Sequence, residues 1–486
     1  MIDATLFDQW LQRITTEMQP SGATNSASSY WKRYFHFDTR LTEDSIIKWR
    51  QRLLDSDYIR SHAFYPFLRH EVIKKTFGDI PVQNALGEIR HIRAKLRVKP
   101  TRPICYAAHQ DALIYAWYAF NLHQLLEKKI DEAKVNEHVI AYRSADGRCN
   151  IHFAKEAFDF VSDKGECVAL AFDVKSFFDT LDHGIVKQSW CRLLDRPRLP
   201  PDHYTVFKSM TKFRFVRLEK LKQELGEEEF EARRKSTGRF SYPPDFRKRI
   251  RPLIETNPTK GIPQGAPLSA VLSNMYMLEA DKIFAGFAEH YGGYYRRYCD
   301  DILMIVPTVD EQQAHRIINE TMTALNLCIN GDKTEIRRFK QEKGKLTCYD
   351  ENGKFRPLQY LGLEFDGREI RLRSASLSKF HHRLRRNVRQ AGGMAFGKRS
   401  YANGKMVQGS EKILKRTLYT KYSLLGNRNF TSYARKAYEI THSAAIRKQY
   451  LHSIELVNEC VAIETARRKH IIQKALLKQH EADTLI

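Results

Sequence analysis

The chain has 486 residues, more than a single hydrophobic core can serve, so about two to four packed units are expected. Its 81 Lys and Arg residues outnumber its 57 Asp and Glu residues, and the formal net charge of +24 points to a polyanionic partner, nucleic acid before membrane. No apolar stretch approaches the roughly 18 residues that span a bilayer, and residues 1–18 lack the pattern of a signal peptide.

The eight cysteines are scattered along the chain. No pair has metal-ligand spacing, and no cluster suggests a disulfide framework, which fits a reducing environment. We therefore expect a cytoplasmic protein with no membrane partner.

The first third of the chain is predicted to be mostly helical. Residues 1–89 have a mixed helical pattern, interrupted by a loop rich in Ser, Ala and Asn at Ser21–Ser29, and are predicted to form an N-terminal helical extension. The chain is strongly basic from Arg90 to Arg102. An apolar helix is then predicted to begin near Asp111, whose side chain is a candidate N-cap.

The middle of the chain alternates between apolar strands and helices. Val168–Phe172 has the pattern of a buried strand, and Asp173 follows it directly. The stretch at about 190–259 is charged, with a helical pattern at Leu218–Lys235, and is predicted to be a helical insertion at the surface.

Four further elements follow a loop rich in Gly and Pro. The patterns predict a helix at Leu268–Phe284, a hairpin at Tyr294–Val306, an amphipathic helix at Glu311–Leu325 and a short strand pair at Leu358–Phe365.

From Ser374 onward the chain is predicted to be mostly helical, with breaks at Gly392-Gly393 and Gly404–Gly409. Between Arg368 and Ile486 there are 25 Lys and Arg residues and 8 Asp and Glu residues, a net charge of +17. A surplus of this size in about a quarter of the chain predicts a track for a phosphate backbone.

Three acidic residues form the most informative pattern. Asp300 and Asp301 are adjacent at the predicted hairpin tip, where they would repel each other unless a cation lay between them. Asp173 alone would more often be a cap or a turn residue, but here it supplies a third carboxylate at a strand end. Carboxylates on rigid strands suit Mg²⁺, and two such ions about 3.5–4 Å apart would activate a 3′-hydroxyl and neutralise departing pyrophosphate. The pattern predicts a nucleic-acid polymerase.

A loop that opens a helix supports this prediction. Lys260–Met277 reads KGIPQGAPLSAVLSNMYM, with Gln264 and Asn274 as polar side chains in an open backbone that can approach a base pair and sugar closely. Together with FDVKSFFDTLDH at Phe172–His183 and YCDD at Tyr298–Asp301, this loop resembles the motifs of bacterial reverse transcriptases, the group that includes group II intron, retron and phage-defence enzymes. The resemblance covers residues 90–366.

The resemblance implies an α+β fold with the right-hand architecture of polymerases. Fingers are expected at 90–167, and a palm at 168–366, with an antiparallel sheet flanked by helices and interrupted by the charged insertion. A basic, all-helical thumb is expected at 367–486. The implied activity is RNA-directed DNA synthesis from dNTPs with two Mg²⁺ ions, Mn²⁺ being able to substitute.

The resemblance also implies roles for single residues. Lys95 and Arg102 would hold the incoming triphosphate through charge-assisted hydrogen bonds, and Gln264 would contact the template–nucleotide pair. Phe178 would exclude the ribose 2′-hydroxyl, and Lys333 would protonate the pyrophosphate leaving group. The residues implied in primer and template binding are Tyr142, Arg143, Asn274, Tyr298, Leu361 and Gly362.

Ala141–Val161 resembles a stretch of the defence-associated and abortive-infection reverse transcriptases. This branch implies a structured non-coding RNA as template, a DNA product and a role in antiphage defence. Two alternatives stay open: a maturase-like RNA-binding protein related to group II intron proteins, and a protein-primed DNA polymerase that needs no conventional template. The oligomeric state is open too, a homo-oligomer included.

Overall fold

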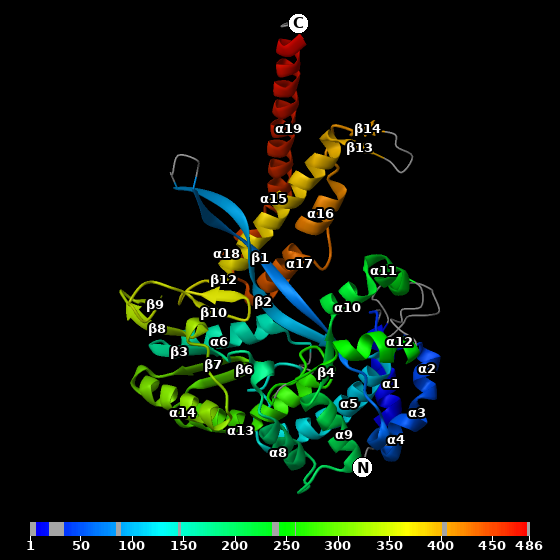
Figure 1. Ribbon diagram of the computed structural model, residues 1–486. Helices are drawn as coiled ribbons and strands as arrows, with labels where there is room; N and C mark the ends of the chain where they lie inside the picture. The colour runs from blue at the N-terminus through cyan, green and yellow to red at the C-terminus, as the bar shows by residue number, and fades with distance from the viewer. Residues whose placement is uncertain are drawn as a thin grey trace.

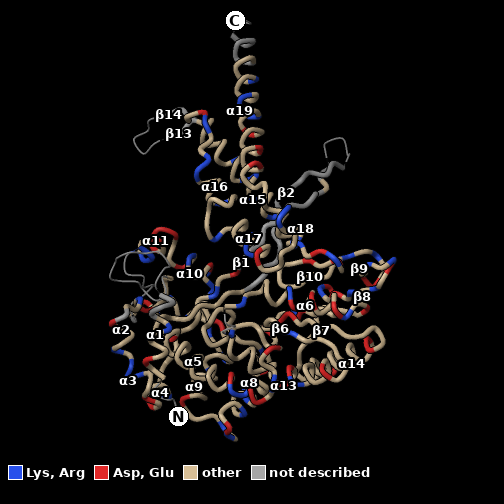
Figure 2. Tube along the Cα trace, turned by 180° about the vertical axis from the view of Figure 1, so that it is seen from behind, with Lys and Arg blue, Asp and Glu red and all other residues tan. Residues whose placement is uncertain are grey.

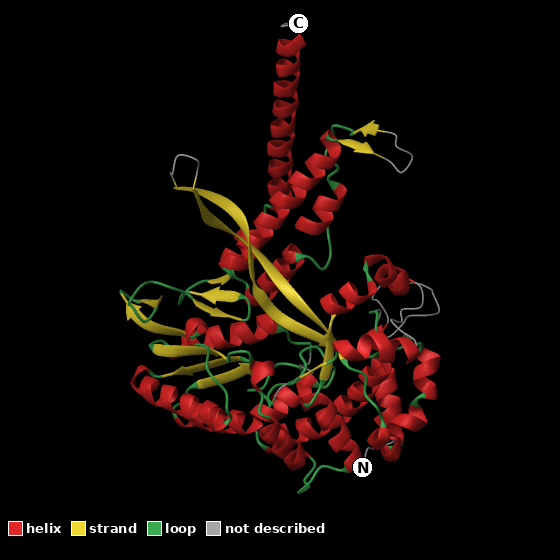
Figure 3. Ribbon diagram, in the orientation of Figure 1, coloured by secondary structure: helices red, strands yellow, loops and turns green. Residues whose placement is uncertain are grey.

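The computed structural model describes residues 6–18, 34–83, 89–143, 147–235, 243–257, 259–400 and 406–483. Figure 1 shows a broad body of helices and sheets, from which a long hairpin and the C-terminal helices extend. Figure 3 shows that helices make up most of this body and that a group of strands lies at its left side. Within the described residues, each helix is too short or too polar to cross a membrane.

The palm is built on a five-stranded antiparallel sheet, as predicted. Its order is β6-β7-β3-β8-β9. The strands are β3 (Cys167–Asp173), β6 (Tyr294–Tyr298), β7 (Asp301–Val306), β8 (Glu335–Glu342) and β9 (Lys345–Tyr349). The pattern predicted β3, β6 and β7, but not β8 and β9; in β8 the many charged residues conceal the strand alternation.

Helices cover both faces of this sheet. They are α6 (Asn150–Lys164), α13 (Ser269–His290) and α14 (Glu311–Ala324). Along β3, Val168 and Leu170 join the core shared with α13 and α14, whereas Ala169 joins the core shared with α6. Successive strand residues point to opposite faces, so a strand covered on both sides is apolar throughout. The two cores therefore hold β3 in place, and with it Asp173, the last residue of the strand.

The fingers contain a long hairpin that the sequence patterns did not predict. β1 (Phe67–Gln83) pairs antiparallel with β2 (Ile89–Tyr106), and β4 (Arg214–Arg217) and β5 (Glu255–Thr256) extend the sheet in the order β2-β1-β4-β5. The prediction of helix through residue 89 is therefore wrong for the described residues after Ser61. The predicted domain boundary between residues 89 and 90 also separates β1 from β2, although these strands pair with each other. The β-branched and aromatic residues of β1 favour a strand, and β1 pairs with β2 at sequence separations from 6 residues (Gln83 with Ile89) to 38 residues (Leu68 with Tyr106).

Four short helices precede the hairpin, in agreement with the prediction for this part. They are α1 (Leu6–Met18), α2 (Glu43–Lys48), α3 (Arg50–Leu54) and α4 (Ser56–Ser61). In α1, Phe7, Trp10 and Ile14 form a buried stripe. The rings of Phe7 and Trp10 lie 5.6 and 5.2 Å from that of Trp117 in α5 (His109–Glu132), edge to face.

The start of α5 shows a distant residue acting as cap. The predicted N-cap, Asp111, lies inside the helix and is buried, where its carboxylate accepts from the Tyr65 backbone N–H at 2.8 Å and contacts His62. The carboxylate of Asp38 caps the helix instead, accepting from the backbone N–H groups of His109 and Gln110. The prediction for Asp111 was wrong because the capping side chain comes from some 70 residues upstream.

The predicted charged insertion divides into a buried and an exposed part. Two helices, α7 (Phe177–Thr180) and most of α8 (His183–Leu193), precede this stretch. Its own helices are α9 (Pro201–Thr211), α10 (Leu218–Leu225), α11 (Glu227–Lys235) and α12 (Pro243–Asp245), followed by a π-helix (Phe246–Ile250) and a 3₁₀ turn (Arg251–Leu253). α8 and α9 belong to the main core through Trp190 and Met210, so the prediction of a surface element from residue 190 was wrong there. α10 and α11 are helical as predicted.

The thumb follows a small sheet of β10 (Leu358–Tyr360), β11 (Leu363–Phe365) and β12 (Ile370–Leu372). Its helices are α15 (Ser374–Phe396), α16 (Arg416–Tyr422), α17 (Phe430–Thr441), α18 (Ala444–Tyr450) and α19 (Ser453–Asp483). α15 continues through Gly392-Gly393, where a break was predicted. The glycine at position 392 allows α19 to pack closely, since a Cβ there would lie only 2.8 Å from the side chain of Glu464. A short hairpin, β13 (Lys398–Ser400) with β14 (Met406–Gln408), departs from the all-helical prediction.

Figure 2 shows Lys and Arg along the thumb helices. On α15, Phe380, Leu384 and Val388 are buried against the thumb core, whereas Arg383 and Arg386 are exposed between them. The helix therefore offers one basic face to the solvent.

We predict that Trp10→Ala destabilises the N-terminal region by about 3–5 kcal/mol, because it leaves a cavity beside Trp117. Urea unfolding followed by fluorescence measures the loss. Gln9→Ala, an exposed position on the same helix, should change the free energy of unfolding by less than about 0.5 kcal/mol. Equal effects of the two substitutions would contradict the packing described here.

Candidate active site

The three predicted acidic residues meet at one end of the palm sheet. Asp173 ends β3 and lies directly opposite Asp301, the first residue of β7, in the antiparallel register. Asp301 also pairs with Tyr298 across a two-residue turn, Cys299-Asp300. These residues line a cavity of about 440 Å³. The remaining residues of its lining are Pro103, Tyr142, Val174, Lys175, Ser176, Phe177, Phe178, Asp179, Gln264, Asn330 and Lys333.

The turn has an uncommon backbone conformation. Cys299 has a φ of 61°, in the left-handed region, and so does Tyr142 on the neighbouring wall with a φ of 62°. The Tyr142 hydroxyl donates to Cys299 Sγ at 3.3 Å. Non-glycine residues hold such conformations only where surrounding contacts fix them.

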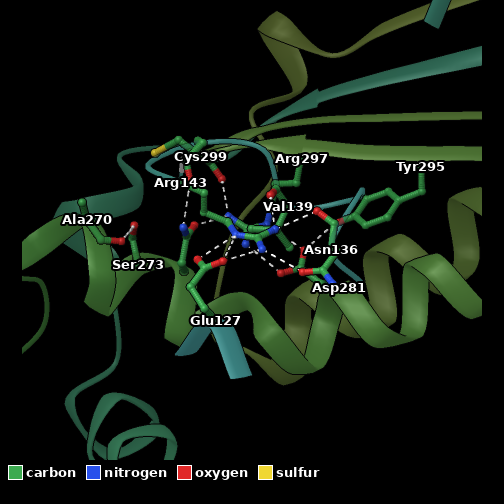
Figure 4. A network of polar contacts seen from close by, with 12 residues as sticks. Glu127, Asn136, Val139, Arg143, Ala270, Ser273, Asp281, Tyr295, Arg297 and Cys299 are labelled. Atoms are coloured by element: carbon green, nitrogen blue, oxygen red, sulfur yellow. Dashed lines mark hydrogen bonds and ion pairs between the residues drawn. The ribbon is translucent and has the colours of Figure 1, made fainter. Parts of the chain in front are cut away.

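Buried polar contacts supply that support (Figure 4). The guanidinium of Arg297, fully buried, makes two 2.7 Å hydrogen bonds to the Asp281 carboxylate. It also donates to Asn274 Oδ1 and to the Cys299 carbonyl oxygen, both at 3.1 Å. Burial alone would lower the pKa of Arg297, but the Asp281 charge outweighs it and the pKa lies above its usual value.

Two residues expected to bind primer or template are engaged inside the protein instead. Asn274 is only 2% exposed, and its amide donates to the Ala141 carbonyl at 2.9 Å while accepting from Arg297. The guanidinium of Arg143 donates to the Glu127 carboxylate and to the Val139 carbonyl (Figure 4). In the structure these donors and acceptors hold the protein's own loop beneath Tyr142, and the roles of Asn274 and Arg143 in primer or template binding stay predictions.

Loss of hydration and neighbouring negative charge both act on the protonation of Asp301. Loss of hydration, with the charges of Asp300 and Asp173 after it, raises the pKa of Asp301 from 3.8 to about 6, although the side chain opens into the cavity. Asp173 accepts from Lys333 Nζ at 2.7 Å and from Asn330 Nδ2 at 3.1 Å. A lysine ammonium therefore supplies positive charge at the carboxylate cluster.

The donor chemistry fits hard divalent cations, because carboxylate oxygens at a rigid sheet edge carry negative charge that one lysine offsets only in part. As the side chains lie, no three His, Cys, Asp or Glu residues in the described parts of the chain are grouped so as to hold a metal ion. Asp173, Asp300 and Asp301 remain the predicted ligands.

The loop of the IPQG motif forms the wall opposite the carboxylates. Ile262 N–H donates to the Phe178 carbonyl at 2.8 Å, and the Cys105 N–H of β2 donates to the Gln264 carbonyl at 2.8 Å. A Cβ at Gly261 would lie 2.6 Å from the Asp179 carbonyl oxygen, so only glycine allows this approach. Phe178 and Gln264 thereby reach the cavity, where their roles stay predictions.

The other predicted residues lie on different parts of the molecule. Lys95 and Arg102 are on β2, where the structure describes the backbone pairing but their side chains lie outside the described residues. Tyr298 lines the cavity. Leu361 and Gly362 form the β10–β11 turn, where Asn150 Nδ2 donates to the Leu361 carbonyl at 2.8 Å. Their roles at a primer terminus stay predictions.

Several residues that contribute to the site were not predicted from the sequence. Asn330 contacts Asp173, and Arg297 with Asp281 supports the acidic turn. Arg297 could have been noticed, because alternation along the strand places it on the same face as the buried Tyr295. A charged residue at such a position needs a buried partner of opposite charge.

One comparison with known protein families identifies the family of the chain. A family model described as reverse transcriptase (RNA-dependent DNA polymerase) matches residues 121–365, half of the 486 residues, including all three aspartates and Lys333. The chain therefore belongs to the reverse transcriptase family. Membership of this family implies dependence on divalent metal ions. None of the curated proteins matches the chain.

Solved structures similar to the chain include three of telomerases. An apo telomerase from Candida tropicalis truncated from its C-terminal domain is 12% identical, with 68% of this chain and 61% of that chain covered and a TM-score of 0.34. Another apo telomerase from Candida tropicalis is 13% identical, with 88% and 69% covered and a TM-score of 0.38. A telomerase from Candida albicans in complex with a fragment of telomeric RNA is 13% identical, with 88% and 67% covered and a TM-score of 0.35. The chain thus spans about three fifths of the first of these.

The raised pKa of Asp301 predicts that metal binding depends on pH. Below about pH 6 this carboxyl is protonated, so affinity for Mn²⁺ should rise as the pH increases through about 6. In the metal-free protein, the contribution of Asp301 to the free energy of unfolding changes with pH in the opposite direction to the Mn²⁺ affinity. Because its pKa lies above the unfolded value, its contribution to stability is present at acid pH and is lost as the pH rises through about 6.

Titration calorimetry with MnCl₂ at about pH 5 and about pH 8 measures this dependence. The wild type should bind more tightly at the higher pH, and Asp301→Asn should bind weakly with a flatter pH dependence. A wild-type affinity that is the same at both pH values would contradict the placement of Asp301 as a cation ligand.

Proposed function

We propose that this protein is an RNA-directed DNA polymerase that extends a primer with dNTPs by two-metal catalysis, with Mg²⁺ as the usual ion. The observation that carries the proposal is the meeting of Asp173, Asp300 and Asp301 at the edge of one cavity, on paired strands of an antiparallel sheet. Bound divalent cations would supply activation of the primer 3′-hydroxyl and neutralisation of the pyrophosphate.

The chain's own residues would bind and orient the substrates around these carboxylates. Phe178 faces the same cavity as the acidic turn and would exclude a 2′-hydroxyl, while Gln264 would contact the templating pair. Lys333 lies within reach of the carboxylates and is 59% exposed, so it is free to turn toward a departing pyrophosphate and donate a proton. Lys95 and Arg102 would hold the triphosphate from β2.

The proposed template is a structured RNA, bound in part by the basic thumb. Support comes from the exposed Arg383 and Arg386 on α15 and from the net charge of +17 between Arg368 and Ile486. The resemblance of Ala141–Val161 to defence-associated reverse transcriptases favours a dedicated non-coding RNA and a role in antiphage defence.

We predict that replacing Asp300 and Asp301 together by Asn reduces DNA synthesis to background, because the amides cannot carry the negative charge that holds the cations. The assay incubates the purified protein and its co-purifying RNA with dNTPs and MgCl₂ and sequences the DNA. Glu279→Gln, an exposed acid on α13, is the matched control and should leave synthesis unchanged. RNA-templated synthesis retained by the double variant would contradict the assignment. A wild-type product unrelated to the RNA would favour template-independent synthesis.

We predict that Phe178→Ala lowers selectivity for dNTPs over rNTPs by about tenfold or more, because it removes the side chain that would clash with a ribose 2′-hydroxyl. Phe178→Tyr keeps the ring and should keep the selectivity. Competitive incorporation of dNTPs and rNTPs on one primer measures both variants. Unchanged selectivity in Phe178→Ala would remove the proposed role.

A further inference from the structure

The Arg297 network reaches the candidate active site from behind the acidic turn. Arg297 lies on β6, and its partner Asp281 lies on α13; both side chains are fully buried. The guanidinium reaches past Asp281 to the Cys299 carbonyl oxygen at 3.1 Å (Figure 4). Cys299 immediately precedes Asp300 and has the left-handed φ of 61°. The buried guanidinium of Arg297 therefore holds the backbone of Cys299, the first residue of the two-residue turn that contains Asp300.

The same network reaches a second strained residue through Asn274. Its Oδ1 accepts from Arg297, and its Nδ2 donates to the Ala141 carbonyl at 2.9 Å. Ala141 precedes Tyr142, whose φ is 62° and whose hydroxyl donates to the Cys299 thiol. One buried Arg–Asn pair thus holds two walls of the cavity in a fixed relation.

A buried ion pair gives little stability by itself, because desolvation of both charges cancels most of the attraction, and an apolar pair of similar volume would often serve the core as well. What an apolar pair cannot do is donate to the Cys299 carbonyl. The planar guanidinium is also the only side chain that satisfies a carboxylate with two parallel bonds and still has donors for two further acceptors.

We propose that Arg297 is a positioning residue for DNA synthesis: it fixes the turn that directs Asp300 and Asp301, and through Asn274 it keeps the Tyr142 wall in register with them. The inference rests on the proposed function for its kinetic part only. The placement of the carboxylates can be measured separately, by metal binding alone.

The neighbouring Arg296 offers a matched control. It lies on the same strand, and its side chain is 11% exposed, with the guanidinium 4.5 Å from the Tyr294 ring and close to Glu137. In the described part of the chain, its polar contacts are to His138, Tyr295, Glu137 and Glu156 and not to the acidic turn. Arg296→Lys thus repeats the same chemical change at a similar depth without touching Cys299.

The experiment compares Arg297→Lys, Arg296→Lys and Asn274→Asp with the wild type in MnCl₂ titrations and in steady-state DNA synthesis. Lysine keeps the charge beside Asp281 but cannot make the bidentate pair and reach Cys299 together. Arg297→Lys should lose about 10- to 100-fold in Mn²⁺ affinity. It should also lose about 10- to 100-fold in kcat, with a smaller change in KM for dNTPs. Arg296→Lys should match the wild type in all three quantities.

Asn274→Asp covers the case in which Arg297→Lys does not fold. It keeps an oxygen acceptor for Arg297 but places an oxygen against the Ala141 carbonyl, so the Tyr142 wall alone should loosen. KM for dNTPs should rise several-fold while Mn²⁺ affinity stays near that of the wild type.

The proposal is overturned if Arg297→Lys equals Arg296→Lys in Mn²⁺ affinity and kcat, or, where only Asn274→Asp folds, if that variant has the KM of the wild type. A wild type that makes no DNA would remove the proposed function but not this inference. Loss of Mn²⁺ affinity in Arg297→Lys alone would still support the placement of the carboxylates by Arg297.

Discussion

Mutual repulsion among three carboxylates is the constraint around which this site is arranged. The pairing of β3 with β7 places Asp173 directly opposite Asp301, and the two-residue turn adds Asp300 beside them. Left alone, such a group would take up protons, as the raised pKa of Asp301 indicates. The fold holds the carboxylates together nonetheless, and it provides Lys333 and Asn330 as partners for Asp173. Because one lysine offsets only part of the negative charge of three carboxylates, the site favours the binding of cations.

Rigidity at this edge comes from elements that are far apart in the sequence. The sheet is packed on both faces, so β3 and β7 cannot shift without disturbing two cores. Behind the turn, Arg297 and Asn274 tie α13, β6 and the loop before Tyr142 into one buried network. In front, the loop around Gly261 contacts the backbone of α7 and β2. The cavity therefore has fixed walls on several sides.

The sequence predicted those parts of the molecule whose signal is local. The buried strand before Asp173, the hairpin that carries Asp300 and Asp301 and the helix that begins at Ser269 each follow from apolar periodicity within a short window. The β1–β2 hairpin was missed although its two strands are neighbours in the sequence. The cap that Asp38 provides was missed because it lies some 70 residues before the helix that it caps.

Residue type alone does not show which of two uses a polar side chain has. Asn274 and Arg143 belong to motifs that resemble nucleic-acid-binding segments, and their polarity fits that role. In the structure both side chains are spent on the protein's own carbonyls and carboxylates. Only the three-dimensional neighbourhood shows whether a hydrogen-bonding group faces a ligand or supports the residue that does.

Diffraction from crystals soaked in MnCl₂, collected for the anomalous signal of manganese, tests the central claim most directly. The account predicts at least one anomalous peak between the carboxylates of Asp173 and Asp301, with Lys333 displaced from Asp173. Crystals in which Lys333 still contacts Asp173, and no peak appears at this edge of the sheet at saturating Mn²⁺, would contradict it.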